Sequence, residues 1–130
     1  MSADHWAAAY IGSPWIAGEH DCWGFVRRVY REQFGLDVAA VDIDATSLSA
    51  ALRAFDRHPE FCHWQAVATH RDGDAVLMGK GLRPAHVGLW CEADGGGVLH
   101  AIEGAGVVFQ CPAALAASGW RILASYRRAP

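Results

Sequence analysis

The sequence lacks any apolar run close to the roughly 20 residues that a membrane-spanning helix requires. It also lacks the clusters of Lys and Arg that mark a nucleic-acid surface, since its basic residues are spread along the chain and its net charge is −3. The first residues show no basic segment followed by a long apolar stretch, so no secretory signal is visible. These absences predict a protein that is made in the cytoplasm without a signal peptide, binds no nucleic acid and does not insert into a membrane.

Cysteine is sparse, and its spacing does not favour a structural zinc site. The four cysteines, Cys22, Cys62, Cys91 and Cys111, form no Cys-x-x-Cys pair. Without a sign of an oxidising compartment, disulfides are not expected either. We therefore expect one of the four to be chemically active and the others to be inert, small, buried apolar residues. No cofactor or metal is expected.

The elements that the sequence does predict are typical of one α+β domain over residues 1–130. Apolar positions at helical spacing predict a helix that begins after Asp21 and ends at Gly35, and shorter helices are expected over residues 2–10 and 47–55. Glycine-rich turns then separate short apolar runs, which predict an antiparallel meander with one helical turn, residues 113–118, before its last strand. The expected strands are residues 75–78, 85–91, 98–102, 107–109 and 122–126. Helices followed by strands indicate N-terminal helices packed on a central antiparallel β-sheet of about five or six strands.

Cys22 is the first candidate for chemistry, because it follows Asp21 at the expected start of the strongest helix. The N-terminus of a helix carries partial positive charge and free N–H groups. That environment lowers the pKa of a thiol, and the thiolate is its nucleophilic form. The same N–H groups could hold the oxyanion of a tetrahedral intermediate. The alternative is that Cys22 merely begins the buried stripe of the helix.

His86 is the candidate base. On a strand it shares a face with Gly88 and Trp90, and this face lies opposite the more apolar one that is expected to pack on the core. A single histidine on a strand is more often structural or exposed than catalytic, so its neighbours must decide. Cys91 points to the other face, which argues against a zinc site built from His86, Cys91 and His100.

His100 is the candidate partner of His86. If the turn around Asp94 and Gly95 pairs the two strands, His100 falls close to Gly88 and diagonal to His86. A second histidine there could orient the first ring and fix its tautomer. This hypothesis depends on the register, because a shift of one residue would move His100 to the other face.

Several segments together resemble one family. In chain order they are Gly12-Ser13-Pro14-Trp15, Asp21-Cys22-Trp23-Gly24-Phe25-Val26, Gly73-Asp74-Ala75-Val76-Leu77, His86-Val87-Gly88-Leu89-Trp90 and Leu99-His100-Ala101. Over residues 10–126 the chain is similar to the NlpC-type cysteine peptidases, a papain-like group that acts on bacterial murein. The end of the chain, Gly119-Trp120-Arg121-Ile122-Leu123 and Ser125-Tyr126-Arg127, resembles the phage-tail branch of this family.

The resemblance implies roles for individual residues. Cys22 would be the nucleophile, His86 the base, and His100 the polar residue that orients His86. The expected substrate-binding residues are Asp21, Trp15, Trp23, Tyr10 and Gly88. The implied reaction hydrolyses an amide bond in peptidoglycan stem peptides, between D-glutamate and a diamino acid, by acyl transfer through the thiolate.

The chain departs from the family pattern around the substrate site. Trp15 stands where the family usually has Tyr, and an indole N–H can donate a hydrogen bond but not accept one. Trp23 stands where most members have Ser, which works with the preceding Asp to bind a substrate amino group. The stretch between Trp15 and Cys22 is also shorter than in secreted members. We expect these changes to alter the stem-peptide preference.

The leading hypothesis is a murein peptidase of a phage or prophage tail that acts at the cell wall, with other tail proteins as partners. One alternative is a tail-assembly protein with little or no catalysis, although the presence of Cys22, His86 and His100 together argues against it. Another is a thiol amidase or lipid acyltransferase on the same fold. The absence of a membrane-binding segment weakens the lipid version.

Overall fold

The computed structural model describes residues 5–17, 21–40, 59–80 and 84–130. The helical elements are the 3-10 helices η1 (Trp6–Tyr10) and η2 (Pro59–His63) and the α-helices α1 (Cys22–Phe34) and α3 (Pro112–Ala117). The strands are β1 (Trp64–Ala66), β2 (Ala75–Gly79), β3 (Pro84–Cys91), β4 (Gly97–Ile102), β5 (Gly106–Gln110) and β6 (Arg121–Arg128). Among the described residues, no helix has the length and apolarity that crossing a membrane requires.

The six strands form one antiparallel sheet in the order β1-β6-β2-β3-β4-β5. The predicted α+β class, the five predicted strands and the helical turn before the last strand are therefore confirmed. The meander is correct from β2 to β5 and wrong for β6, which returns across the sheet to pair with β2 and β1. The sequence also missed β1, because three residues are too few to show an alternating pattern.

Helix α1 begins and ends where its capping residues predict. The carboxylate of Asp21 accepts a hydrogen bond from the backbone N–H of Gly24, 2.9 Å away, which satisfies one of the free donors of the first turn. Gly35 ends the helix in the left-handed conformation, with φ of 65°, and its N–H donates to the carbonyl of Tyr30. The expected start and end of this helix are confirmed.

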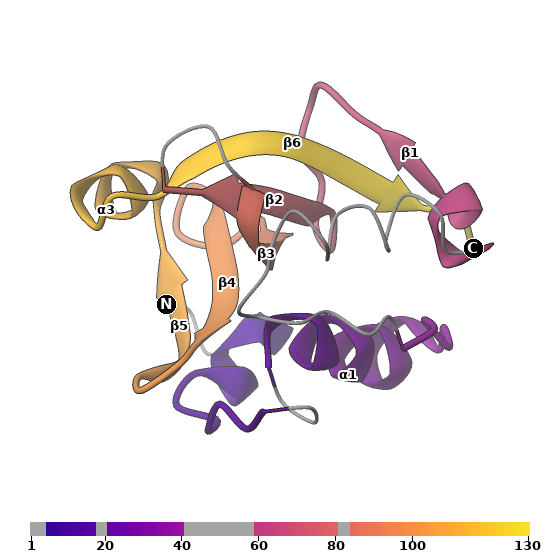
Figure 1. Ribbon diagram of the computed structural model, residues 1–130, viewed down its shortest axis with the longest axis horizontal. Helices are drawn as coiled ribbons and strands as arrows, with labels where there is room; N and C mark the ends of the chain where they lie inside the picture. Colours follow the sequence, from indigo (N-terminus) through magenta and orange to yellow (C-terminus); the bar gives the residue numbers. More distant parts are fainter. Residues whose placement is uncertain (1–4, 18–20, 41–58, 81–83) are drawn as a thin grey trace.

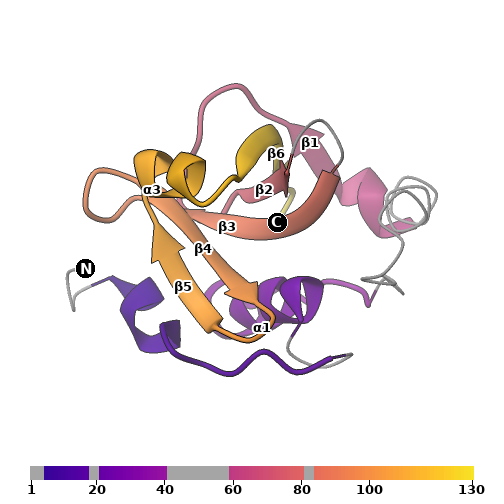
Figure 2. The same cartoon turned by 60° about the vertical axis from the view of Figure 1, so that its left-hand side comes forward.

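The sheet is covered on both faces, by different elements. Helix α1 packs its buried side chains against one face, where Leu89, Cys91, Leu99 and Ala101 belong to the same core cluster (Figure 1). On the other face, Leu115 of α3 joins a second cluster of strand residues (Figure 2). The second cluster comprises Val76, Met78, Trp90, Val98 and Leu115, with Trp120 packed against it. Alternate residues of one strand therefore face different environments.

The remaining predicted helices lie partly or wholly outside the described residues. Of the helix expected over residues 2–10, the described part is η1, a 3-10 helix whose first turn is capped by the side chain of His5. The helix expected over residues 47–55 falls outside the described residues.

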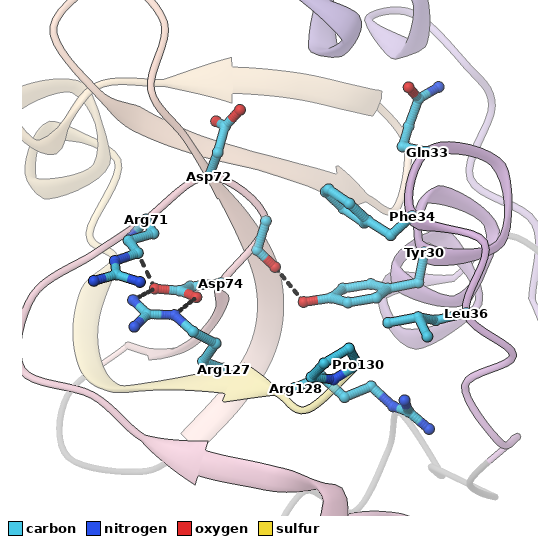
Figure 3. A pocket seen from close by; sticks show the side chains of 11 residues that line it. Tyr30, Gln33, Phe34, Leu36, Arg71, Asp72, Asp74, Arg127, Arg128 and Pro130 are labelled. Atoms are coloured by element: carbon cyan, nitrogen blue, oxygen red, sulfur yellow. Dashed lines mark hydrogen bonds and ion pairs between the residues drawn. The ribbon is translucent and has the colours of Figure 1, made fainter.

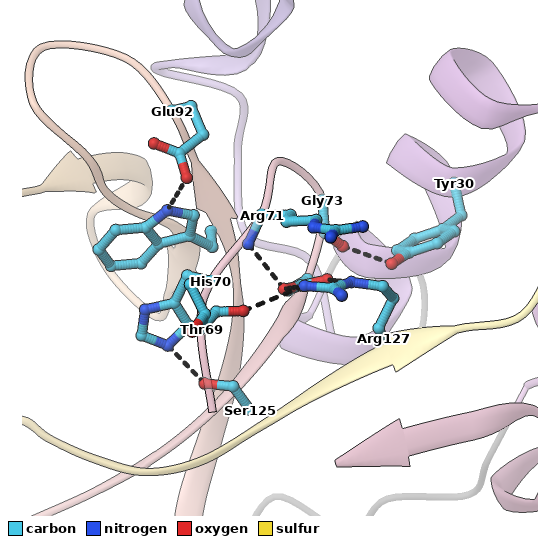
Figure 4. A network of polar contacts seen from close by, with 10 residues as sticks. Tyr30, Thr69, His70, Arg71, Gly73, Glu92, Ser125 and Arg127 are labelled. Atoms are coloured by element: carbon cyan, nitrogen blue, oxygen red, sulfur yellow. Dashed lines mark hydrogen bonds and ion pairs between the residues drawn. The ribbon is translucent and has the colours of Figure 1, made fainter. Parts of the chain in front are cut away.

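A buried carboxylate ties the start of β2 to the end of β6. Asp74 is 1% exposed and accepts hydrogen bonds from Arg127 Nε and Nη2, at 2.9 and 2.7 Å, and from the backbone N–H of Arg71, at 2.8 Å. Next to it, the hydroxyl of Tyr30 in α1 donates to the carbonyl of Gly73 (Figure 4). A hollow of about 530 Å³ opens beside this network, lined by Tyr30, Arg71 and Arg127 among others (Figure 3).

Removing this carboxylate should destabilise the fold. We expect Asp74→Ala to lower the free energy of unfolding by about 2–3 kcal/mol, because hydrogen bonds to a charged group are lost and a backbone N–H loses its partner. Chemical denaturation measures the change. Arg28→Ala is the control, because the pair of Arg28 and Glu32 is exposed and should contribute less than about 1 kcal/mol. Equal effects of the two substitutions would contradict the assignment.

Candidate active site

Cys22 is the first residue of α1 and lies beside β3. Its thiol is largely buried, and the burial raises its pKa to about 11. A backbone hydrogen bond from Val87, together with those from Trp23 and Cys22 itself, acts in the opposite direction, and the carboxylate of Asp21 raises the pKa further. The expectation of a lowered thiol pKa is thus wrong for the free protein, because desolvation of the thiolate outweighs the helix N-terminus.

His86 and His100 are joined by a hydrogen bond of 2.9 Å between His86 Nε2 and His100 Nδ1. The pairing of Leu89 with Leu99 puts Gly88 opposite His100, so the two histidines are diagonal neighbours on one face. This is the register that the sequence hypothesis required. His100 is fully buried, whereas His86 keeps part of its surface exposed.

Gly88 makes room for this contact. A Cβ at this position would lie 2.6 Å from Val98 Cγ1 and 2.9 Å from His100 Cβ, which are distances that real side chains do not tolerate. The sequence predicted that Gly88 binds substrate. In the structure, the absence of a side chain at Gly88 leaves room for His100 on the neighbouring strand. Its small size allows β4 to approach β3 where the rings meet.

Burial keeps both imidazoles neutral. It lowers the pKa of His86 to about 3, with a smaller contribution from the neighbouring His100, and it also lowers the pKa of His100. At neutral pH the free protein therefore holds a neutral thiol at the Val87 backbone and a neutral imidazole pair formed by His86 and His100. This arrangement suits a base that takes the thiol proton during the attack, rather than a preformed ion pair.

Two further side chains contact the histidines and a third lies on one of these two, and the sequence reasoning missed all three. Gln110, the last residue of β5, lies behind His100 with its Oε1 2.9 Å from His100 Nε2. Trp120 stacks on His86, with ring centroids 4.9 Å apart, and Lys80 Nζ lies 4.9 Å from the Trp120 ring centre. A polar residue ending an apolar strand was a signal for Gln110. Trp120 and Lys80 gave none, because their proximity depends on the path of β6.

The other predicted substrate-binding residues do not all gather at this point. Asp21 does, as the cap of α1. Tyr10 and Trp23 are buried in the core, where Tyr10 donates to Glu32 and the Trp23 indole donates to the carbonyl of Ala39. Trp15 packs against the edge of this core and remains partly exposed.

The segment before Trp15 is attached to the start of β5. Gly12 N–H donates to the carbonyl of Val107, and Val107 N–H donates to the carbonyl of Ser13. Trp90 shares a strand face with His86, but it stacks on His70, with ring centroids 4.2 Å apart. The indole at the site is that of Trp120.

The remaining cysteines differ from the expectation in part. Cys91 is buried in the core as predicted, on the face opposite His86. Cys62 and Cys111 are exposed, so the expectation that they are buried apolar residues is wrong. Cys62 lies in η2, and Cys111 lies just before α3. Within the described ranges, no three His, Cys, Asp or Glu side chains could hold a metal ion.

Comparison with known proteins gives one match over most of the chain. The model of the NlpC/P60 family matches residues 9–115, a range that includes Cys22, His86 and His100. No curated protein shows a significant match to the chain. Members of the matching family are generally cysteine peptidases that act on the cell wall.

The buried histidines should make stability depend on pH. A histidine whose pKa is lowered on folding binds a proton more readily in the unfolded chain, so the free energy of unfolding falls as pH drops below the ordinary value of 6.5 towards about 3. Between about pH 6.5 and about pH 5, the free energy of unfolding should fall in both proteins. We expect the fall to be about 1–2 kcal/mol smaller in His86→Gln, because glutamine cannot titrate. Urea titrations across this range measure the difference. Parallel stability curves would contradict a buried neutral His86.

Gly88→Ala should separate the two histidines. We expect the added methyl group to push β4 away, break the hydrogen bond between His86 and His100, and lower the free energy of unfolding by about 1–3 kcal/mol. NMR of the ring nitrogens and denaturation measure the two effects. Gly104→Ala is the control, because open space surrounds this glycine, and its positive φ should cost about 1–2 kcal/mol without disturbing the rings. Unchanged ring signals in Gly88→Ala would contradict the role of this glycine.

Proposed function

Because the chain belongs to the NlpC/P60 family, we propose that it is a cysteine peptidase that hydrolyses an amide bond in the stem peptides of peptidoglycan. Cys22 is the nucleophile, His86 is the base, and His100 orients His86. The observations that carry the proposal are the hydrogen bond between His86 and His100 and the contact of the Cys22 thiol with the backbone of Val87, one residue from His86.

The proposed reaction is acyl transfer in two steps. His86 takes the proton of the Cys22 thiol as the sulfur attacks the peptide carbonyl, and a C–S bond forms. Backbone N–H groups at the start of α1 would hold the oxyanion. The C–N bond then breaks as His86 protonates the leaving amine. Water attacks the thioester, His86 accepts its proton, and the thiol is restored as the acid product leaves.

The desolvated setting of Cys22 and His86 supports this sequence of proton transfers. A neutral thiol and a neutral imidazole carry no charge in this desolvated setting before substrate arrives. The charge then develops where the helix N-terminus can stabilise it. His100 can stabilise the imidazolium of His86 through the bond that already joins the rings.

The finer features of the proposal rest on the motifs of the chain. The bond that we propose joins D-glutamate to a diamino acid, as the segments around Asp21, His86 and His100 suggest by resemblance. The end of the chain, together with Trp23 after Cys22, supports a phage or prophage tail protein that reaches the cell wall from the tail. Trp15 and Trp23 replace the usual Tyr and Ser, so the stem-peptide preference should differ from that of the secreted members.

Digestion of purified murein peptides tests the proposed function. We expect wild type to release new fragments whose masses identify the bond, and Cys22→Ala to release none, because the nucleophile is absent. Mass spectrometry reads the products. His86→Ala should also abolish turnover, whereas His100→Ala should retain part of it, because an orienting residue is only partly needed.

Matched controls separate chemistry from folding. Cys62→Ser changes an exposed thiol in η2, at the β1 edge of the sheet, and should digest like wild type. Thermal unfolding verifies that Cys22→Ala is folded. If wild type and Cys22→Ala both leave every murein peptide intact, the peptidase proposal fails and the tail-assembly reading gains weight.

A further inference from the structure

A row of hydrogen bonds continues behind His86 and ends at the surface. His86 Nε2 meets His100 Nδ1 at 2.9 Å, and His100 Nε2 meets Gln110 Oε1 at 2.9 Å. Gln110 Nε2 donates to Ser118 Oγ, also at 2.9 Å. The four side chains come from β3, β4, β5 and the end of α3. Both nitrogens of the buried His100 ring are therefore engaged.

The chemistry of these groups fixes the direction of each bond. A carbonyl oxygen accepts hydrogen bonds and cannot donate, so His100 Nε2 must carry the proton that points at Gln110. A neutral imidazole has one N–H, which leaves His100 Nδ1 as a bare acceptor. His86 Nε2 must then donate to it, and His86 Nδ1 is left with its lone pair.

We infer that Gln110 is a positioning residue, which accepts a hydrogen bond from His100 and thereby keeps His86 in the tautomer whose free Nδ1 can take a proton from Cys22. The inference rests on the proposed function, because it concerns the same base. Ser118 contributes by engaging the amide nitrogen of Gln110, which leaves the carbonyl oxygen facing His100.

A neutral amide suits this position better than a carboxylate. A carboxylate would also accept from His100 Nε2, but its charge would favour a protonated His100. A protonated His100 donates from both nitrogens, so His86 would have to accept at Nε2 and carry its own proton on Nδ1. His86 would then no longer be a base. Gln110 keeps the direction of the bonds without adding that charge.

The other titratable groups around His100 do not supply an alternative partner. From β3 the titratable neighbour is His86, whereas Cys22 of α1 meets the Val87 backbone. At the end of β2, Lys80 lies on Trp120, whose ring stands at 90° to that of His100. Among the described residues, His100 Nε2 therefore donates its hydrogen bond to Gln110.

Ring-nitrogen NMR of the whole chain tests the inference directly. In wild type at neutral pH, we expect both His86 and His100 to show a protonated Nε2 and a bare Nδ1. In Gln110→Leu, His100 loses its acceptor, so a measurable population of the opposite tautomer should appear at both rings. Gln65→Leu makes the same chemical change at an exposed position of β1 and should leave both rings as in wild type.

Kinetics with murein peptides provide a second readout. We expect Gln110→Leu to lower kcat by roughly 10-fold, as removal of a partner behind a functional histidine does, with KM little changed. Gln110→Glu should recover most of the activity at about pH 8, because the acceptor is restored. The acid limb of its pH profile should lie higher than in wild type by about 1 pH unit or more, because the carboxylate raises the pKa of His100.

Two outcomes would overturn the inference. One is a wild-type His100 protonated on Nδ1, since that reverses every bond in the row. The other is a folded Gln110→Leu variant with wild-type tautomers, or a Gln110→Glu variant with an unshifted acid limb. If wild type cleaves no murein peptide, the proposed function fails, and the ring nitrogens still decide whether Gln110 sets the tautomers.

Discussion

The pairing of Leu89 with Leu99 determines which polar side chains can meet at the candidate site. The ladder between β3 and β4 covers residues 89–91 against residues 97–99, and His86 and His100 lie just beyond its end. Because side chains alternate along a strand, this register sends both histidines to the same face. A shift by one residue would bury one ring in the core with α1 and break the contact. Gly88 keeps the gap between the rings free of side-chain atoms.

The second constraint is the position of the start of α1 against β3. Asp21 fixes where the helix begins, and the buried face of the helix fixes how it lies on the sheet. Cys22 therefore reaches the backbone of Val87, one residue from His86. Burial of this junction has a cost for any charge, which explains why both the thiol and the imidazoles are neutral in the free protein.

Local signals in the sequence were sufficient for the helix and for most strands. Asp21 and Gly35 mark α1 because caps depend on residues within one turn. The glycine-rich turn around Asp94 and Gly95 joins β3 to β4, and the alternation of apolar residues then indicates which face carries His86. The sequence indicated that His100 would meet His86 in one register of β3 and β4, but it did not determine which register forms.

What could not be predicted depends on contacts between distant segments. Strand β6 returns across the sheet, and this path alone brings Trp120 onto His86. Gln110 meets His100 through the pairing of β4 with β5, which a count of residue spacing does not reveal. The thiol pKa was predicted in the wrong direction for a related reason. A helix N-terminus is a local property, whereas burial belongs to the packed molecule.

The same burial sets the requirements for a base at this site. An imidazole that is neutral in the free protein must be in the correct tautomer before it can take the thiol proton. A second neutral imidazole behind it can accept its N–H and later share the positive charge, without placing a fixed negative charge in the core. That second ring is itself ambiguous, since either nitrogen can carry the proton. The direction of the hydrogen bonds must therefore be set by a group that can only accept a hydrogen bond from the second ring. The carbonyl oxygen of Gln110 is such a group.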